Sequence, residues 1–196
     1  MTMLRISLLL AAFLFLGSAA AQTTLRVRGT ITAVDNDVLS VKDRNGQDLK
    51  LYVPNDVSVA VAKAIRFEDI KRGDYVGATT MKGADGTLTA LEVHYLAPTV
   101  PQGHIPWDLQ PGSMMTNANV ESIVTDTGKR ELTLQYKDGT QKIVVPDTAP
   151  IVRAVPGARA DLSAGEYIFA AVQVAPDGKM TAPRIQVSKE GVRPPQ

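Results

Sequence analysis

The chain has no cysteine, few aromatic residues and no long hydrophobic run beyond residue 21. The absence of cysteine excludes disulfides, thiol nucleophiles and thiolate metal ligands. Aromatic residues make up 5% of the chain and no basic run accompanies them, which argues against base stacking over a basic groove. Lys and Arg number 21 against 20 Asp and Glu, so the surface has no general attraction for nucleic acid or anionic lipid. We therefore expect no nucleic-acid partner and no transmembrane span.

Signature motifs of common enzyme classes are also missing. The chain contains no GxGxxG, no Walker-type loop, no GxSxG elbow and no HExxH pair. A Ser/His/Asp triad would have to use one of the two histidines, His94 or His104. The hydroxyls near them in sequence, Ser113 and Thr116, lie in a segment with little regular patterning. We predict a protein that is not an enzyme, and an envelope enzyme is a further alternative.

The first 21 residues have the pattern of a secretory signal peptide. A short start with one cation, Arg5, precedes an apolar run over 6–16, and small residues follow up to Ala21. Eleven helical residues rise roughly 16 Å, about half the hydrocarbon thickness of a bilayer. The pattern predicts cleavage between Ala21 and Gln22, and a periplasmic or secreted protein.

The rest of the chain has the same pattern twice, at an offset of 92 residues. The segment 67–76, FEDIKRGDYV, corresponds in side-chain character to 159–168, RADLSAGEYI. A period of this length is one small domain and not a solenoid repeat. The recurring anchors are Pro54, Gly73, Asp85 and Gly86, which return as Pro146, Gly165, Asp177 and Gly178.

Within each copy the pattern indicates strands joined by tight turns. Leu39 and Val41 alternate with polar residues before Asn45-Gly46, a strong hairpin signal. About twenty residues after the third strand do not have strand periodicity, and their spacing predicts a single helical turn before Gly73 or Gly165. Three strands, a helical connection and two strands are the order of an OB-type barrel, with an SH3-like barrel as the alternative.

These patterns predict an all-β protein with two tandem five-stranded OB-like barrels. The predicted boundaries are a signal peptide over 1–21, a first barrel over 22–97, a Pro-rich linker over 98–114, a second barrel over 115–190 and a flexible tail over 191–196. The linker is rich in proline, which favours an extended and stiff connection between the two halves.

Four residues in and beside this linker are the candidates for ligand binding or interdomain contact. They are His94, His104, Trp107 and Asp108. His94 is out of phase with Leu91 and Val93, so we expect its side chain to point outwards. In the second copy Gln186 stands at this position, so the shared fold does not require an imidazole. An alternative is that His94 packs beneath the linker while Trp107 fills the seam between the barrels.

A metal site is the second interpretation of the same region. Imidazole, carboxylate and thioether groups together are ligands for copper or zinc. The candidate ligands are Glu92, His94, His104, Asp108, Met114 and Met115. In the first interpretation the protein needs no cofactor.

The segment 104–120, HIPWDLQPGSMMTNANV, together with the flanking hairpin units, resembles an uncharacterised family of exported proteobacterial proteins. These proteins are similar to tandem OB-like domains of the DUF5666 type, a domain of unknown function. The resemblance covers nearly all of the chain after the leader and implies a fold and a compartment, but no activity. We expect a non-enzymatic binding or accessory protein of the cell envelope, whose partner is an envelope protein or a small ligand.

Overall fold

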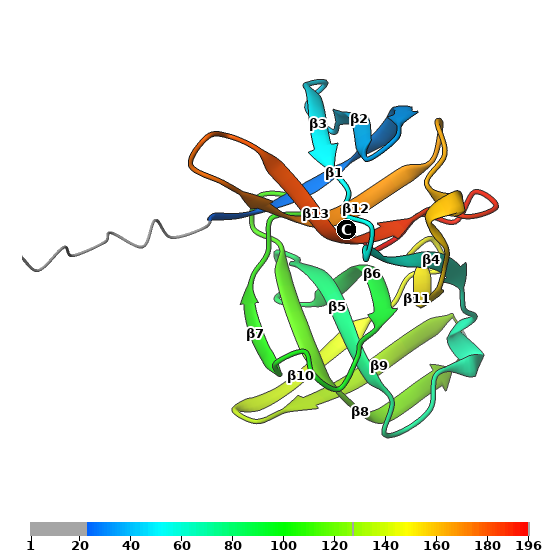
Figure 1. Ribbon diagram of the computed structural model, residues 1–196. Helices are drawn as coiled ribbons and strands as arrows, with labels where there is room; N and C mark the ends of the chain where they lie inside the picture. Colours follow the sequence, from blue (N-terminus) through cyan, green and yellow to red (C-terminus); the bar gives the residue numbers. More distant parts are fainter. Residues whose placement is uncertain (1–22, 127, 196) are drawn as a thin grey trace, which may run out of the picture.

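The computed structural model describes residues 23–126 and 128–195, and they form an all-β structure, as the sequence predicts (Figure 1). The predicted signal peptide lies outside these residues. The first half contains the following strands: β1 (Thr23–Asp35), β2 (Val38–Asp43), β3 (Asp48–Tyr52), β4 (Ser58–Ala64), β5 (Tyr75–Lys82) and β6 (Leu88–Tyr95).

The second half has six strands in the same order, after a short strand in the linker, β7 (Gly103–Pro106). The strands are β8 (Met114–Asp126), β9 (Lys129–Tyr136), β10 (Gly139–Val144), β11 (Ile151–Pro156), β12 (Tyr167–Val174) and β13 (Met180–Val187). Each half therefore has one strand more than predicted, because the stretch after the third strand contains β4 in one half and β11 in the other.

Five strands close into a barrel, which we call the lower barrel after its place in Figure 1. The order β10-β9-β8-β5-β6 is closed by a parallel contact between β10 and β6, where Ile143 lies opposite Leu88. Strands β8, β9 and β10 come from the second half of the chain, whereas β5 and β6 come from the first. The lower barrel is thus built from both halves.

Five further strands form the upper strand group, in the order β13-β12-β1-β2-β3. One parallel pair, Thr181 opposite Tyr52, joins the ends of this group. Here β1, β2 and β3 come from the first half and β12 and β13 from the second. The predicted boundaries 22–97 and 115–190 therefore do not delimit the two strand groups, because the halves exchange their last two strands.

The long strands β1 and β8 make this exchange possible. Strand β1 pairs through residues 23–30 with β12 of the other half and through residues 29–35 with β2 of its own half. Strand β8 does the same with β5 and β9. Each of these 13-residue strands thus pairs with strands of both halves, and β8 also pairs with β7.

Strands β4 and β11 cross between the two groups and pair antiparallel with one another. Ala62 lies opposite Ala154, the residue 92 positions further on, so equivalent positions of the two halves pair with each other here. On their other edges β11 pairs with β6 and β4 pairs with β13. The two strands thereby join both groups into one continuous ladder (Figure 1).

The predicted helical connection is reduced to a three-residue 3-10 turn in each half, at Phe67–Asp69 and Arg159–Asp161, and the described residues contain no α-helix. Gly73 and Gly165 follow with φ of +89° and +93°, a conformation that glycine adopts without steric cost. Most of the connection is extended because β4 and β11 gain ladder partners there.

Two apolar cores lie inside these groups, and each one mixes side chains from both halves. In the upper strand group Leu39 and Val41 pack with Ile168 and Ile185, all of them buried. In the lower barrel Phe67 from the first half is buried in the same cluster as side chains of β9 and β10. Neither half can therefore complete a core from its own strands.

The segment after β13 is folded back onto the molecule, in contrast to the predicted flexible tail. Lys189 and Val192 exchange backbone hydrogen bonds across a turn, and Arg193 lies over the ring of Tyr167 at 4.6 Å. Pro194 and Pro195 are buried. The tail is ordered because its proline rings cover apolar surface between the two strand groups.

Within the described residues, no helix has the length and apolarity needed to cross a membrane.

The strand exchange predicts that the two halves fold only together. Fragments 22–97 and 98–196, produced separately, should each lack a cooperative unfolding transition because each lacks strands of both cores. Mixed in equal amounts, they should form a 1:1 complex with the β-sheet circular dichroism of the intact chain. Size-exclusion chromatography with light scattering measures the stoichiometry. A fragment that folds as a stable monomer would contradict the observed strand pairing.

Candidate functional site

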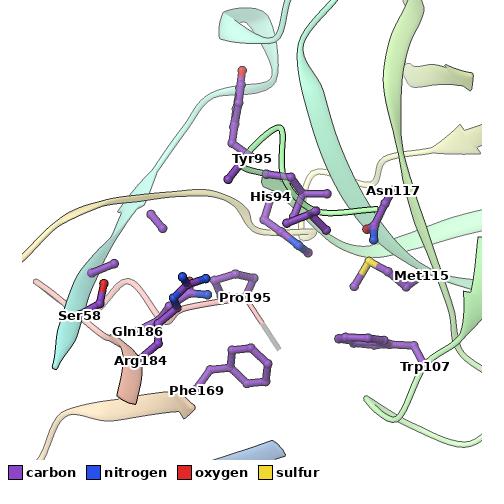
Figure 2. A pocket seen from close by; sticks show the side chains of 15 residues that line it. Ser58, His94, Tyr95, Trp107, Met115, Asn117, Phe169, Arg184, Gln186 and Pro195 are labelled. Carbon is purple, nitrogen blue, oxygen red and sulfur yellow. The ribbon is translucent and has the colours of Figure 1, made fainter. Parts of the chain in front are cut away.

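A cavity of about 350 Å³ lies between the lower barrel and the upper strand group (Figure 2). Both groups contribute to its wall, and so do β4, β11, the linker and the tail. The volume is at the lower end of the range for small-molecule sites. Its polar and aromatic lining consists of Ser58, His94, Tyr95, Trp107, Asn117, Phe169, Arg184 and Gln186.

His94 lines this cavity and is only 9% exposed, so the prediction that it points outwards into solvent is wrong. The alternation around His94 is as predicted, because Val93 is buried in the core of the lower barrel and His94 lies on the opposite face of β6. That face is not open to solvent, because β4, β11, the linker and the tail lie over it and line the same cavity. A β-bulge in β6, where Thr79 lies opposite Glu92 and Thr80 opposite Ala90, leaves Leu91 without a counterpart and outside the core.

The glycine at position 77 leaves room for the imidazole of His94. A Cβ atom built on Gly77 would lie 2.6 Å from His94 Nε2, a distance that real Cβ atoms essentially never show. The same position is 3.1 Å from Asn117 Oδ1. The equivalent residue of the second half is Phe169, whose ring lines the cavity instead. The two halves therefore give this site an imidazole over a glycine on one side and a phenyl ring on the other.

Burial lowers the pKa of His94 to about 4, so the ring is neutral at pH 7. Its Nδ1 is buried without a hydrogen-bond partner and lies 4.0 Å from Glu92 Oε1, which is longer than a hydrogen bond. Glu92 is itself buried and accepts a hydrogen bond of 2.9 Å from Thr79 Oγ1. A neutral histidine beside a buried carboxylate is thus part of the cavity floor.

Trp107 and Asp108 are held against β1 by two arginines. Arg28 donates two hydrogen bonds to the Asp108 carboxylate, at 2.9 and 3.1 Å, and Arg26 lies 3.8 Å from the same carboxylate. The guanidinium of Arg26 also lies 4.3 Å from the centre of the Trp107 ring. These contacts fix the linker over the cavity, so that the single tryptophan of the chain forms part of its wall.

The pKa of Asp108 is lowered, chiefly by the hydrogen bonds from Arg28 and further by the charges of Arg28 and Arg26, while burial opposes the shift. The side chain of Arg28 is 1% exposed, whereas that of Asp108 is 44% exposed. The carboxylate therefore serves as the counter-ion of a buried guanidinium.

His104 lies away from the cavity lining. It is on β7, its Nδ1 is 2.8 Å from Thr116 Oγ1, and its ring stacks with Tyr136 at 6.4 Å between centroids. Burial lowers its pKa. His104 therefore links β7 to β8 and β9.

The six candidate metal ligands are consequently not brought together. Glu92, His94 and Met115 lie near one another around Thr79, whose Oγ1 is 3.9 Å from the Met115 sulfur. Met114 is the neighbour of Met115 along a strand, so its side chain is on the opposite face. In the described part of the chain no three His, Cys, Asp or Glu side chains are grouped so that they could hold a metal ion.

The candidates chosen from the sequence include three of the cavity residues, namely His94, Trp107 and, in the metal interpretation, Met115, but not Asn117, Phe169, Arg184 or Gln186. Pairs of residues at the 92-residue offset were the available signal. Gln186 is the counterpart of His94 and Arg184 is the counterpart of Glu92, so both pairs have different chemistry in equivalent places.

Comparison with known proteins gave no match: no protein-family model, no curated protein and no solved structure matches the chain. The resemblance to DUF5666-type domains is therefore neither supported nor contradicted.

The low pKa of His94 predicts a loss of stability at mildly acidic pH. The unfolded chain binds a proton on this residue below about pH 6.5, whereas the folded chain binds it only near pH 4. The free energy of unfolding should therefore fall by about 3 kcal/mol between pH 6.5 and 4 on account of His94. Urea denaturation at several pH values should show a smaller loss in His94→Gln, which has the residue of the other half.

His104→Gln is the control, because it leaves His94 as the only histidine. In that variant the imidazole Cε1–H signal in the NMR spectrum should titrate with a midpoint below pH 5. A midpoint near 6.5 would show that the ring is solvated and would contradict its place in the cavity floor.

A second prediction concerns the ion pair beneath the linker. Asp108→Asn should lower the free energy of unfolding by about 1.5 kcal/mol at pH 7, because a buried guanidinium loses its counter-ion. The contribution of a carboxylate with a lowered pKa is present above about pH 4 and is lost as the pH falls below it. The difference between variant and parent should therefore shrink towards pH 3. Asp48→Asn, at an exposed pair with Lys42, is the matched control and should cost less than about 0.5 kcal/mol.

Proposed function

We propose that this chain is an exported, non-enzymatic binding protein of the cell envelope, and that its ligand occupies the cavity between the two strand groups. The observation that carries the proposal is the cavity itself, which unites His94 and Trp107 with side chains from both halves. Ligand sites are most often concave, largely apolar and equipped with a few polar groups at the boundary of two structural units.

The arrangement of the polar groups supports binding over catalysis. A general base needs an orienting partner and a nucleophile or substrate proton within hydrogen-bond reach. Here Nδ1 of His94 makes no hydrogen bond, and the hydroxyl of Thr79 donates to Glu92. Ser113, near His104 in sequence, donates to the backbone oxygens of Trp107 and Gln110 and so shapes a turn.

Export and the origin of the fold complete the proposal. The support for export is the apolar leader over 1–21 with its small residues before Gln22. We further propose that the upper strand group is a second closed barrel, and that the chain arose by duplication of a DUF5666-like unit. Support comes from the equal order of strands in both halves and from the equivalent parallel contacts of β10 with β6 and of β13 with β3.

The proposal is tested by filling the cavity. Ala154 lies in the cavity wall, so Ala154→Trp should occupy the space that a ligand would need. Protein purified under non-denaturing conditions from the cells that make it should show an additional bound mass by native mass spectrometry. That mass should be absent from Ala154→Trp and present in the control Ala84→Trp, which changes an exposed loop.

Equal occupancy in both variants would place the ligand elsewhere and overturn the proposed site. A chain without any bound mass, even from its native compartment, would overturn the binding role. The same spectra give the mass of the chain, which should begin at Gln22 if the leader is removed.

A further inference from the structure

We propose that the cavity takes a small organic anion, whose acidic group is held by Arg184 and Gln186 and whose flat apolar body lies between Trp107 and Phe169. This inference rests on the proposed binding function and adds the chemical class of the ligand. It concerns residues of β12, β13 and the linker, of which sequence reasoning considered only Trp107.

Arg184 is the first reason for an anion. It lies in the cavity wall, and within the described part of the chain its guanidinium forms no ion pair and no hydrogen bond. Gln186 is two residues further along the same strand and faces the same cavity (Figure 2). A guanidinium beside an amide N–H group can hold a carboxylate by charge-assisted hydrogen bonds.

The charge balance of the surroundings is the second reason. No carboxylate lines the cavity among the described residues, and the imidazole of His94 is neutral at pH 7. Behind Trp107 two guanidiniums, those of Arg26 and Arg28, share the single carboxylate of Asp108. Arg184 is therefore the only charged side chain among the described residues that line the cavity, and the net charge of Arg26, Arg28 and Asp108 beside Trp107 is also positive, which favours an anion.

One acidic side chain, Glu92, lies close to the cavity but outside its lining. Glu92 and Arg184 occupy equivalent positions of the two halves, but Glu92 is 4% exposed and its Oε1 lies 4.0 Å from His94 Nδ1. Its carboxylate is bound by Thr79 and does not line the cavity. The site is consequently polarised, with its positive end at Arg184.

The aromatic and apolar side chains of the cavity wall indicate the chemistry of the rest of the ligand. Trp107 and Phe169 line the cavity from different strand groups, and the remaining surface includes Met115 and Pro195 (Figure 2). One face of the indole is covered by Arg26 and the ring of Phe169 is approached by Arg28 at 5.0 Å. Both rings thus have an arginine contact, and flat apolar groups pack well against aromatic rings.

Naphthalene-2-carboxylate and its neutral amide, naphthalene-2-carboxamide, are suitable probes because they differ only in charge. Calorimetric titration of the purified protein should show at least tenfold tighter binding of the carboxylate. Arg184→Gln should weaken the carboxylate about tenfold and leave the amide within twofold. Lys63→Gln is the control, since it removes an exposed cation from a strand next to the site without touching the cavity. The NMR signal of the single indole N–H, that of Trp107, reports whether the probe is in the cavity.

The outcomes separate this inference from the proposed function. If both probes shift the indole signal with equal affinity, or if Arg184→Gln binds the carboxylate as the parent does, the preference for anions is refuted while the cavity remains a binding site. If neither probe shifts the indole signal, the inference is also refuted, and the native mass spectra of the cavity-filling variant decide the binding role on their own.

Discussion

At the centre of the molecule β4 and β11 pair antiparallel, and each carries its half of the chain from one strand group into the other. The length of β1 and β8, the mixed composition of both cores and the place of the cavity all follow from this crossing. Because the halves contribute strands to both groups, the groups are joined by two chain connections and by a continuous ladder. The seam is therefore a fixed surface of the fold, and residues that line it keep their relative positions.

The seam, which is the surface between the lower barrel and the upper strand group, contains polar and charged groups that are unfavourable in an apolar core. A neutral histidine over Gly77 and a buried Arg28 with its counter-ion on the linker are both found there. Burying a charge or an unsatisfied polar atom is costly, so such groups persist where the structure surrounds them firmly or where a ligand completes them. The ordered linker and tail supply the walls that give these groups a partly enclosed space.

The sequence was informative about local structure and ambiguous about partners. Alternation at Leu39 and Val41 and the Asn45-Gly46 turn identify strands and a hairpin, because they depend on neighbours in the chain. The exchange of strands was not predictable, since two copies with the same register offer each strand equivalent partners in either half. The exposure of His94 was mispredicted because the face of β6 opposite Val93 is covered by β4, β11, the linker and the tail, and strand periodicity does not show which outer face another segment will cover.

A ligand site on the two-fold axis of two identical subunits contains every side chain twice. An asymmetric molecule bound there can use only one copy of each group. Here the equivalent positions belong to one polypeptide and carry different residues. Gly77 corresponds to Phe169, His94 corresponds to Gln186, and Glu92 corresponds to Arg184. A covalent connection between the halves frees each position to specialise. The crossing of β4 and β11 brings equivalent positions such as His94 and Gln186 to one cavity, where their different side chains can distinguish the two ends of a bound molecule.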